Sequence, residues 1–211
     1  MSSTDFISGL VATARPIRKR RIGQEAMVLM AIGVLQLAGL SSVFSFEALE
    51  RYVAMDPARM ALKLGLTFIC AIGFSALALK SLTPGARRIG EGAVTLGGIA
   101  LIAALIGFDK TMPDGIGSAL MPQYGATCLM TVTALALPVT LALALFAVRG
   151  ASTQLNRTAL MIGLAGGSWG AFAYALQCPF VGLYYLCTWY LGAVVLVGLL
   201  SRLLLPRIAR W

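Results

Sequence analysis

The residues of this chain best suited to chemistry are four cysteines, Cys70, Cys128, Cys178 and Cys187. A thiol can form a disulfide, react with an oxidant or bind a soft metal ion as a thiolate. The chain contains no histidine, which removes the usual second ligand type of a mixed zinc site. It also contains no Cys-x-x-Cys pair, the arrangement common in thiol oxidoreductases. Which thiols can act together therefore depends on the elements that hold them.

The composition indicates that these elements lie in a membrane. The chain is 59% hydrophobic and 12% charged, and its mean hydropathy is +0.86, which is too apolar for a soluble domain of this size. The segment from Thr158 to Ser201 contains no Asp, Glu, Lys or Arg, and Cys178-Pro179 lies near its middle. Because a membrane-spanning helix needs about 20 apolar residues, this segment predicts two spans with a turn near Cys178.

Four further charge-poor segments each predict one span. We therefore expect an all-α fold, a polytopic membrane bundle of six transmembrane helices, with spans at about residues 26–46, 60–79, 92–108, 126–148, 159–177 and 183–205. Residues 1–24 are expected to form a cytoplasmic segment, 25–206 the membrane domain and 207–211 a short tail. The first apolar run is longer than the core of a signal peptide, about 7–15 residues, so we interpret it as a retained span.

The positive charges predict the orientation, because cytoplasmic loops are enriched in Lys and Arg. Most of the 17 basic residues lie before the first span, in the second and fourth loops or after the last span: Arg15, Arg18, Lys19, Arg20, Arg21, Lys80, Arg87, Arg88, Arg149, Arg157, Arg202, Arg207 and Arg210. Both termini are therefore expected to be cytoplasmic. Topology and lipid headgroups explain the net charge of +9, so it does not predict direct binding of nucleic acid.

This topology sorts the cysteines by depth. Cys70 is expected about 15 Å inside the second span, as a buried and inert thiol. Cys128, Cys178 and Cys187 are expected near the outer face, which in a bacterial cell is the oxidising periplasm. Cys128 and Cys178 match best in depth, and Cys187 is a second possible disulfide partner for Cys178. A structural disulfide, free core thiols and a reactive sensing pair all remain open.

The expected spans carry almost no charged side chains. Apart from Arg202, which is counted with the basic residues of the cytoplasmic side, Lys63 is the exception, and it is expected at the outer end of the second span, where its ammonium group can extend to water. Transporters and proton pumps usually keep ionisable groups inside their helices, so substrate translocation is disfavoured. Glycines at Gly163, Gly166, Gly167 and Gly170 are interpreted as positions of close helix packing.

The first residues of the chain predict a short amphipathic helix. Ser2 and Asp5 fit a variant of the capping box, the apolar residues Phe6, Ile7, Leu10, Val11 and Ala14 fall on one helical face, and Pro16 ends the pattern. Such a helix can lie on a lipid surface or in a protein groove. Its polar face lacks the basic residues of interfacial helices, which favours a protein partner.

Several short motifs, in their order along the chain, carry a resemblance to a known family. They are Asp5-Phe6-Ile7-x-x-Leu10, Arg15-Pro16-Ile17-Arg18, Pro84-Gly85-Ala86-Arg87-Arg88, Cys128, Cys178-Pro179 and the end from Trp189 to Trp211. None of them is specific alone, but together they cover nearly the whole chain. In this order they resemble the negative regulator of sigma-F family, six-span anti-sigma factors of the proteobacterial inner membrane.

The resemblance implies a partner and a stimulus. The N-terminal segment would sequester an extracytoplasmic-function sigma factor, with these docking residues: Asp5, Phe6, Ile7, Leu10, Val11, Pro16, Ile17 and Arg18. Cys128 and Cys178 would respond to heavy metals or oxidants. Family members often carry histidines where this chain has Phe180 and Tyr190, so any metal would depend on Cys128 and Cys178 themselves, and thiol oxidation stays open.

No catalytic residue and no cofactor is expected from these patterns. Two alternative functions remain at this point. A membrane thiol oxidoreductase would also place cysteines at the outer face, and a small transporter subunit would fit the number of spans. The sequence does not predict the oligomeric state.

Overall fold

The computed structural model describes residues 21–43, 50, 53–54, 56–82, 122–149 and 154–208. The expected span at 92–108 and the expected docking residues between Asp5 and Arg18 lie outside the described residues. Within these ranges the fold is all-α, and it contains no strand. Its long helices are α2 (Ile22–Val43), α4 (Pro57–Ser81), α7 (Pro122–Arg149), α8 (Leu155–Ala175) and α10 (Leu191–Ile208).

Four described segments are long and apolar enough to cross a membrane. They are Ile22–Ser42, Pro57–Ser81, Gln123–Val148 and Leu186–Ile208. Many of the large apolar side chains on these helices face outward, as expected where lipid rather than water surrounds a bundle. The protein is therefore a multi-pass membrane protein.

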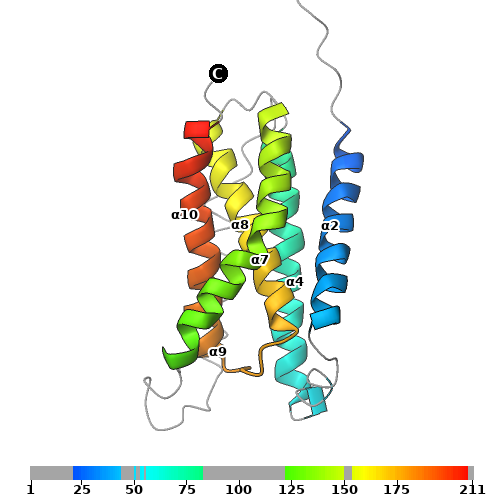
Figure 1. Ribbon diagram of the computed structural model, residues 1–211, viewed down its shortest axis with the longest axis vertical. Coiled ribbons are helices and arrows are strands. Elements are labelled where there is room, and N and C mark those ends of the chain that lie inside the picture. The colour runs from blue at the N-terminus through cyan, green and yellow to red at the C-terminus, as the bar shows by residue number, and fades with distance from the viewer. Residues whose placement is uncertain are drawn as a thin grey trace, which may run out of the picture.

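Helix α8 is the centre of the bundle. It packs against α4, α7 and α10 at once, and Figure 1 shows it running behind α7 and beside α10. Its sequence is rich in glycine and alanine, and most of its residues are buried. Because its neighbours cover it, α8 does not need the large apolar side chains of a helix that faces lipid. This explains why α8 is not among the four long apolar segments.

Local sequence signals account for the ends of α4 and α8. Asp56 caps the start of α4 by accepting a hydrogen bond from the Arg59 amide at 3.1 Å, and Pro57 occupies the first helical position, where its missing N–H is not needed. The C-terminal end of α8 lies just before Cys178-Pro179. Proline cannot continue a helix, and it also disfavours helical geometry in the residue before it.

Helix α7 bends along its length, as Figure 1 shows. Pro138 lies inside this helix, and a proline there removes one backbone hydrogen bond and pushes against the carbonyl four residues earlier. The Gln36 side chain of α2 donates a hydrogen bond of 2.6 Å to the Leu135 carbonyl near this point. α2 is thus attached to α7 close to the proline.

The glycines of α8 allow its neighbours to approach closely. A Cβ atom at Gly163 would lie 2.5 Å from the Val197 carbonyl oxygen of α10, and one at Gly170 would meet the Val132 carbonyl of α7. A Cβ at Gly167 would lie 2.9 Å from the Cα of Val194. These contacts agree with the sequence interpretation that the glycines serve helix packing.

We expect Gly170→Ala to destabilise the bundle by about 1–3 kcal/mol, since the added methyl group must displace backbone atoms of α7 rather than a flexible side chain. The Ala136 amide nitrogen would lie only 2.8 Å from it. The measurement is the thermal unfolding midpoint of the purified protein in detergent.

Gly73→Ala is the matched control, because Gly73 lies in α4 with nothing within 4 Å of the added atom. This control variant should be as stable as the wild type or slightly more stable, because alanine favours helix. Equal midpoints for both variants would contradict the close approach of α7 and α8.

Candidate functional site: a buried thiol cluster

Cys128 and Cys178 come together at one end of the bundle. Cys128 lies in the second turn of α7 and Cys178 follows the end of α8, and their exposed fractions are 0% and 1%. Both belong to one buried cluster, and their side chains are close enough to interact electrostatically. We call Cys128, Cys178, Lys63, Tyr174, Tyr185 and Tyr190 the thiol cluster.

All four cysteines of the chain are free thiols in the structure. The two other cysteines differ from the pair in burial, since Cys70 in α4 and Cys187 are each only partly buried. The expectation of a fully buried Cys70 was therefore only partly correct. Cys187 is not part of the buried group around Cys178, so the structure brings Cys128, rather than Cys187, to Cys178.

Three tyrosines surround the thiols. The Tyr185 hydroxyl donates a hydrogen bond of 3.3 Å to the Tyr124 carbonyl and lies within hydrogen-bonding reach of the Cys128 thiol. The hydroxyls of Tyr174 and Tyr190 lie beside the Cys178 thiol. The Tyr190 hydroxyl is buried and has no hydrogen-bond partner of regular geometry among the described residues, so Cys178 is its polar neighbour.

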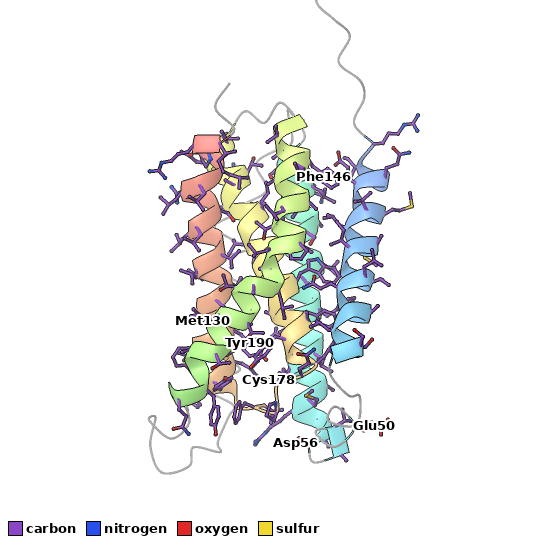
Figure 2. The ribbon with its side chains drawn as sticks, in the orientation of Figure 1. Glu50, Asp56, Met130, Phe146, Cys178 and Tyr190 are labelled. Carbon is purple, nitrogen blue, oxygen red and sulfur yellow. The ribbon has the colours of Figure 1, made fainter. Side chains whose placement is uncertain are left out.

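A π-helical turn places two of these tyrosines. The short helix α9 (Leu183–Tyr185) continues into the π-helical turn η1 (Leu186–Tyr190), which in turn continues into α10. The Leu191 amide donates to the Leu186 carbonyl across five residues, and this wider turn brings residues five apart onto one side. The rings of Tyr185 and Tyr190 consequently lie 6.4 Å apart in the cluster. Figure 2 shows Tyr190 and Cys178 near each other toward the lower end of the bundle.

Sequence reasoning did not identify the three tyrosines as members of one site with the cysteines. In a regular α-helix Tyr185 and Tyr190 would point in different directions, so their spacing gave no sign of a shared site. The insertion of one residue in η1 could only be seen in the structure. Such π-helical insertions occur frequently at functional sites.

Lys63 is the charged member of the cluster. Its side chain extends from α4, is 1% exposed, and donates hydrogen bonds of 2.6 Å to the Cys178 carbonyl and 3.1 Å to the Phe180 carbonyl. Its ammonium nitrogen also lies 5.6 Å from the centre of the Tyr190 ring, within the range of a cation–π contact.

The expectation that Lys63 extends to water was therefore wrong. The connection between α8 and α9 covers its side chain, and the carbonyl groups there replace water as hydrogen-bond acceptors. The sequence placed Lys63 at the correct end of its helix but gave no information on what lies over it. A buried ionisable group in a membrane helix is a marker of function.

The described residues contain no group of three Cys, Asp or Glu side chains that could hold a metal ion. Cys128 and Cys178 are the two thiols that lie together, and Lys63 is the cation beside them. The arrangement can support reaction of the thiols with an electrophile or oxidant, formation of a disulfide, or two-coordinate capture of a soft metal ion.

The cluster and the start of α2 lie at opposite ends of the bundle. In Figure 1 the chain enters α2 at the top, whereas the connection from α8 to α9 is at the bottom. Between these ends, α2 contacts α7 and α8. One contact is the hydrogen bond from Gln36, and in another the Trp169 ring occupies the space beside Gly33, where a Cβ atom would lie 3.0 Å from it.

A polytopic bundle of apolar helices defines an integral membrane protein, and this one buries two thiols and a lysine together at one end. The family comparison adds a regulatory role. Residues 10–211 match the family model described as negative regulator of sigma F, and the chain belongs to this family. No curated protein and no solved structure matches it.

Membership of this family implies a sigma factor as partner and a regulatory rather than an enzymatic role. It confirms the resemblance that the sequence motifs indicated.

A reagent that joins two neighbouring thiols should cross-link Cys128 to Cys178. We expect dibromobimane, which becomes fluorescent when both of its arms react, to label the reduced wild-type protein, because both thiols lie in one cluster. Fluorescence of the purified band, with peptide mapping, is the measurement.

Cys187→Ser is the matched control and should keep the signal, whereas Cys128→Ser and Cys178→Ser should each remove it. If Cys187→Ser removed the signal and Cys128→Ser kept it, the assignment of the neighbouring pair would be wrong.

Proposed function

We propose that this protein is an inner-membrane anti-sigma factor. Its N-terminal segment binds an extracytoplasmic-function sigma factor in the cytoplasm and releases it when Cys128 and Cys178 react with an oxidant or a soft metal ion. Family membership supports the sigma-factor partner. The observation that carries the sensing role is the meeting of two thiols, distant in sequence, in one buried cluster.

The N-terminal segment is the part of the proposal that provides the docking surface. Its proposed contact residues are Asp5, Phe6, Ile7, Leu10, Val11, Pro16, Ile17 and Arg18. An amphipathic segment of this kind can place its apolar face in a groove of a partner protein. The segment leads directly into α2, which begins at Ile22, so a movement of α2 would change how the segment is presented.

The contacts of α2 support a coupling between the two ends. Cys128 lies on α7 and Cys178 at the end of α8, and among the described helices α2 makes its most extensive contacts with these two. Gln36 donates a hydrogen bond to the Leu135 carbonyl near the bend of α7, and the Trp169 ring of α8 packs closely against Gly33. A reaction that moves Cys128 relative to Cys178 would shift α7 against α8. The contacts of Gln36 and Gly33 would transmit this movement to α2.

The energy that such a switch needs is modest. Moving a two-state equilibrium from almost fully bound to almost fully released requires a difference of about 5.5 kcal/mol between the two states. Joining or modifying two thiols in a closely packed cluster can supply energy on this scale, because overpacking or loss of packing at one buried site alone costs about 1–5 kcal/mol.

Replacing both sensor cysteines should abolish induction. We expect the double variant with Cys128→Ser and Cys178→Ser to keep the sigma factor bound under all conditions. A reporter gene under a promoter that depends on this sigma factor should then stay at the uninduced level after diamide or cadmium treatment. The reason is that serine keeps the size of the side chain but has no thiol chemistry.

The matched control is Cys70→Ser with Cys187→Ser, which should be induced like the wild type. Normal induction in the Cys128 and Cys178 double variant, at normal protein levels, would refute the sensing role.

Removing the N-terminal segment should separate membrane insertion from sigma-factor binding. We expect a protein that lacks residues 2–18 to remain in the membrane fraction, because the helices of the bundle are intact, and to lose the sigma factor in co-purification. The reporter gene should then be fully active without a stimulus.

The full-length protein with Cys128→Ser and Cys178→Ser is the control for co-purification and should retain the sigma factor. Retention of the sigma factor by the truncated protein would show that docking takes place elsewhere.

A further inference from the structure

Lys63 has a position that the proposed sensing role does not explain. A lysine side chain that loses water must be stabilised in another way, since burial of an isolated charge is costly. Here two carbonyl oxygens of the α8–α9 connection accept its hydrogen bonds, at 2.6 and 3.1 Å. Among the described residues, the ionisable groups that act on Lys63 electrostatically are Cys178 and Cys128, and neither is a carboxylate.

The first consequence of this position is mechanical. The carbonyl that accepts the shorter hydrogen bond belongs to Cys178 itself, and the second carbonyl belongs to Phe180, two residues later. Both lie in the connection between α8 and α9, where residues 178–182 are not helical. Backbone hydrogen bonds from the Cys178 amide to the Tyr174 carbonyl and from the Leu186 amide to the Gly182 carbonyl join the two ends of this connection to the neighbouring helices. Lys63 thus attaches the backbone on both sides of Pro179 to α4.

The second consequence is electrostatic. An ammonium group is a compact point charge, and no carboxylate among the described residues neutralises this one. In a partly apolar environment a unit charge a few ångströms away changes the energy of a charged reagent by a few kcal/mol. A reagent that carries a negative charge is attracted to the thiols, and a positively charged one is repelled.

We propose that Lys63 is a positioning and selectivity residue of the thiol pair, which holds the Cys178 backbone against α4 and makes Cys178 react preferentially with anionic thiol reagents. This inference rests on the proposed function in that it treats Cys178 as a sensor thiol. It adds the class of reagent that the charge favours, which is an anionic thiol reagent over an uncharged one of the same size.

Alkylation of the purified, reduced full-length protein tests both parts. Iodoacetate and iodoacetamide are nearly the same size and differ by one negative charge, and peptide mass spectrometry gives the rate at each cysteine. Cys187 is the internal reference, because it is partly exposed and burial is the single influence resolved on its thiol. The readout is the iodoacetate-to-iodoacetamide rate ratio at Cys178 divided by the same ratio at Cys187.

In the wild type this normalised ratio should be about tenfold above one, the size expected for a nearby unit charge at an intermediate effective dielectric constant. Lys63→Arg should keep it, since arginine is always charged. Lys63→Gln retains hydrogen-bond donors without the charge, and it should bring the ratio to about one. Lys80→Met is the matched control at the exposed end of α4, and it should leave the ratio unchanged.

Lys63→Met removes the donors as well as the charge. We expect it to speed the reaction of Cys178 with uncharged iodoacetamide by about tenfold or more, because the connection is no longer held by two hydrogen bonds to a charged group. The rate at Cys70, which lies in the same helix, should not change. Size-exclusion chromatography monitors folding, and Lys63→Arg and Lys63→Gln decide the charge question if Lys63→Met does not fold.

Three results would overturn the proposal. A wild-type ratio near one, or a high ratio that persists in Lys63→Gln, would show that the charge of Lys63 does not act on Cys178. An unchanged iodoacetamide rate in folded Lys63→Met would show that Lys63 does not hold the connection. The alkylation assay contains no sigma factor, so its result does not depend on the sensing role. The role of Lys63 and the sensing role of the cysteines can therefore be refuted separately.

Discussion

The close burial of α8 is the constraint on which the rest of the structure depends. This helix touches α4, α7 and α10 at the same time, and three helices can surround a fourth at short distance only where its side chains are small. Gly163 and Gly167 admit α10, and Gly166 and Gly170 admit α7. The path of α8 then determines where its last turn ends, and this end carries Cys178 to the first turns of α7, where Cys128 lies.

The chemistry of the site follows from what this packing excludes. Water is kept away from both thiols and from Lys63, so the polar groups of the cluster interact with each other and with the backbone of the α8–α9 connection. In such surroundings each charge and each hydrogen bond has a larger effect than in water. A small chemical change at one sulfur atom is therefore felt by the whole cluster, including the tyrosines that η1 directs into it.

Much of this arrangement could be predicted from the sequence. The charge-poor segments predicted helices, the spacing of small residues in α8 predicted close packing, and depth in the membrane selected Cys128 as the neighbour of Cys178. Within the described residues the helix and packing predictions hold because they depend on composition and on helical periodicity, both of which are local properties. The placement of Cys128 and Cys178 in one buried cluster agrees with the prediction from depth.

The missed features depend on contacts between distant parts of the chain. Lys63 meets the carbonyls of Cys178 and Phe180 across more than half of the sequence, so no local pattern could reveal its burial. Tyr185 and Tyr190 share one side only because the helix widens by one residue in η1. The hydrogen bond from Gln36 to the Leu135 carbonyl joins α2 to α7 near Pro138, and no local pattern reveals this contact between distant parts of the chain.

The small side chains of α8 also have a consequence for how the protein is made. α8 leaves the ribosome before α10, at a time when one of the three surfaces that will cover it does not yet exist. With little lipophilic surface of its own, α8 gains little by entering lipid alone. Its stable insertion is therefore expected to wait for α10, so that the last two helices enter the bilayer as one hairpin, with Cys178-Pro179 at its turn and the cluster assembled as the hairpin closes.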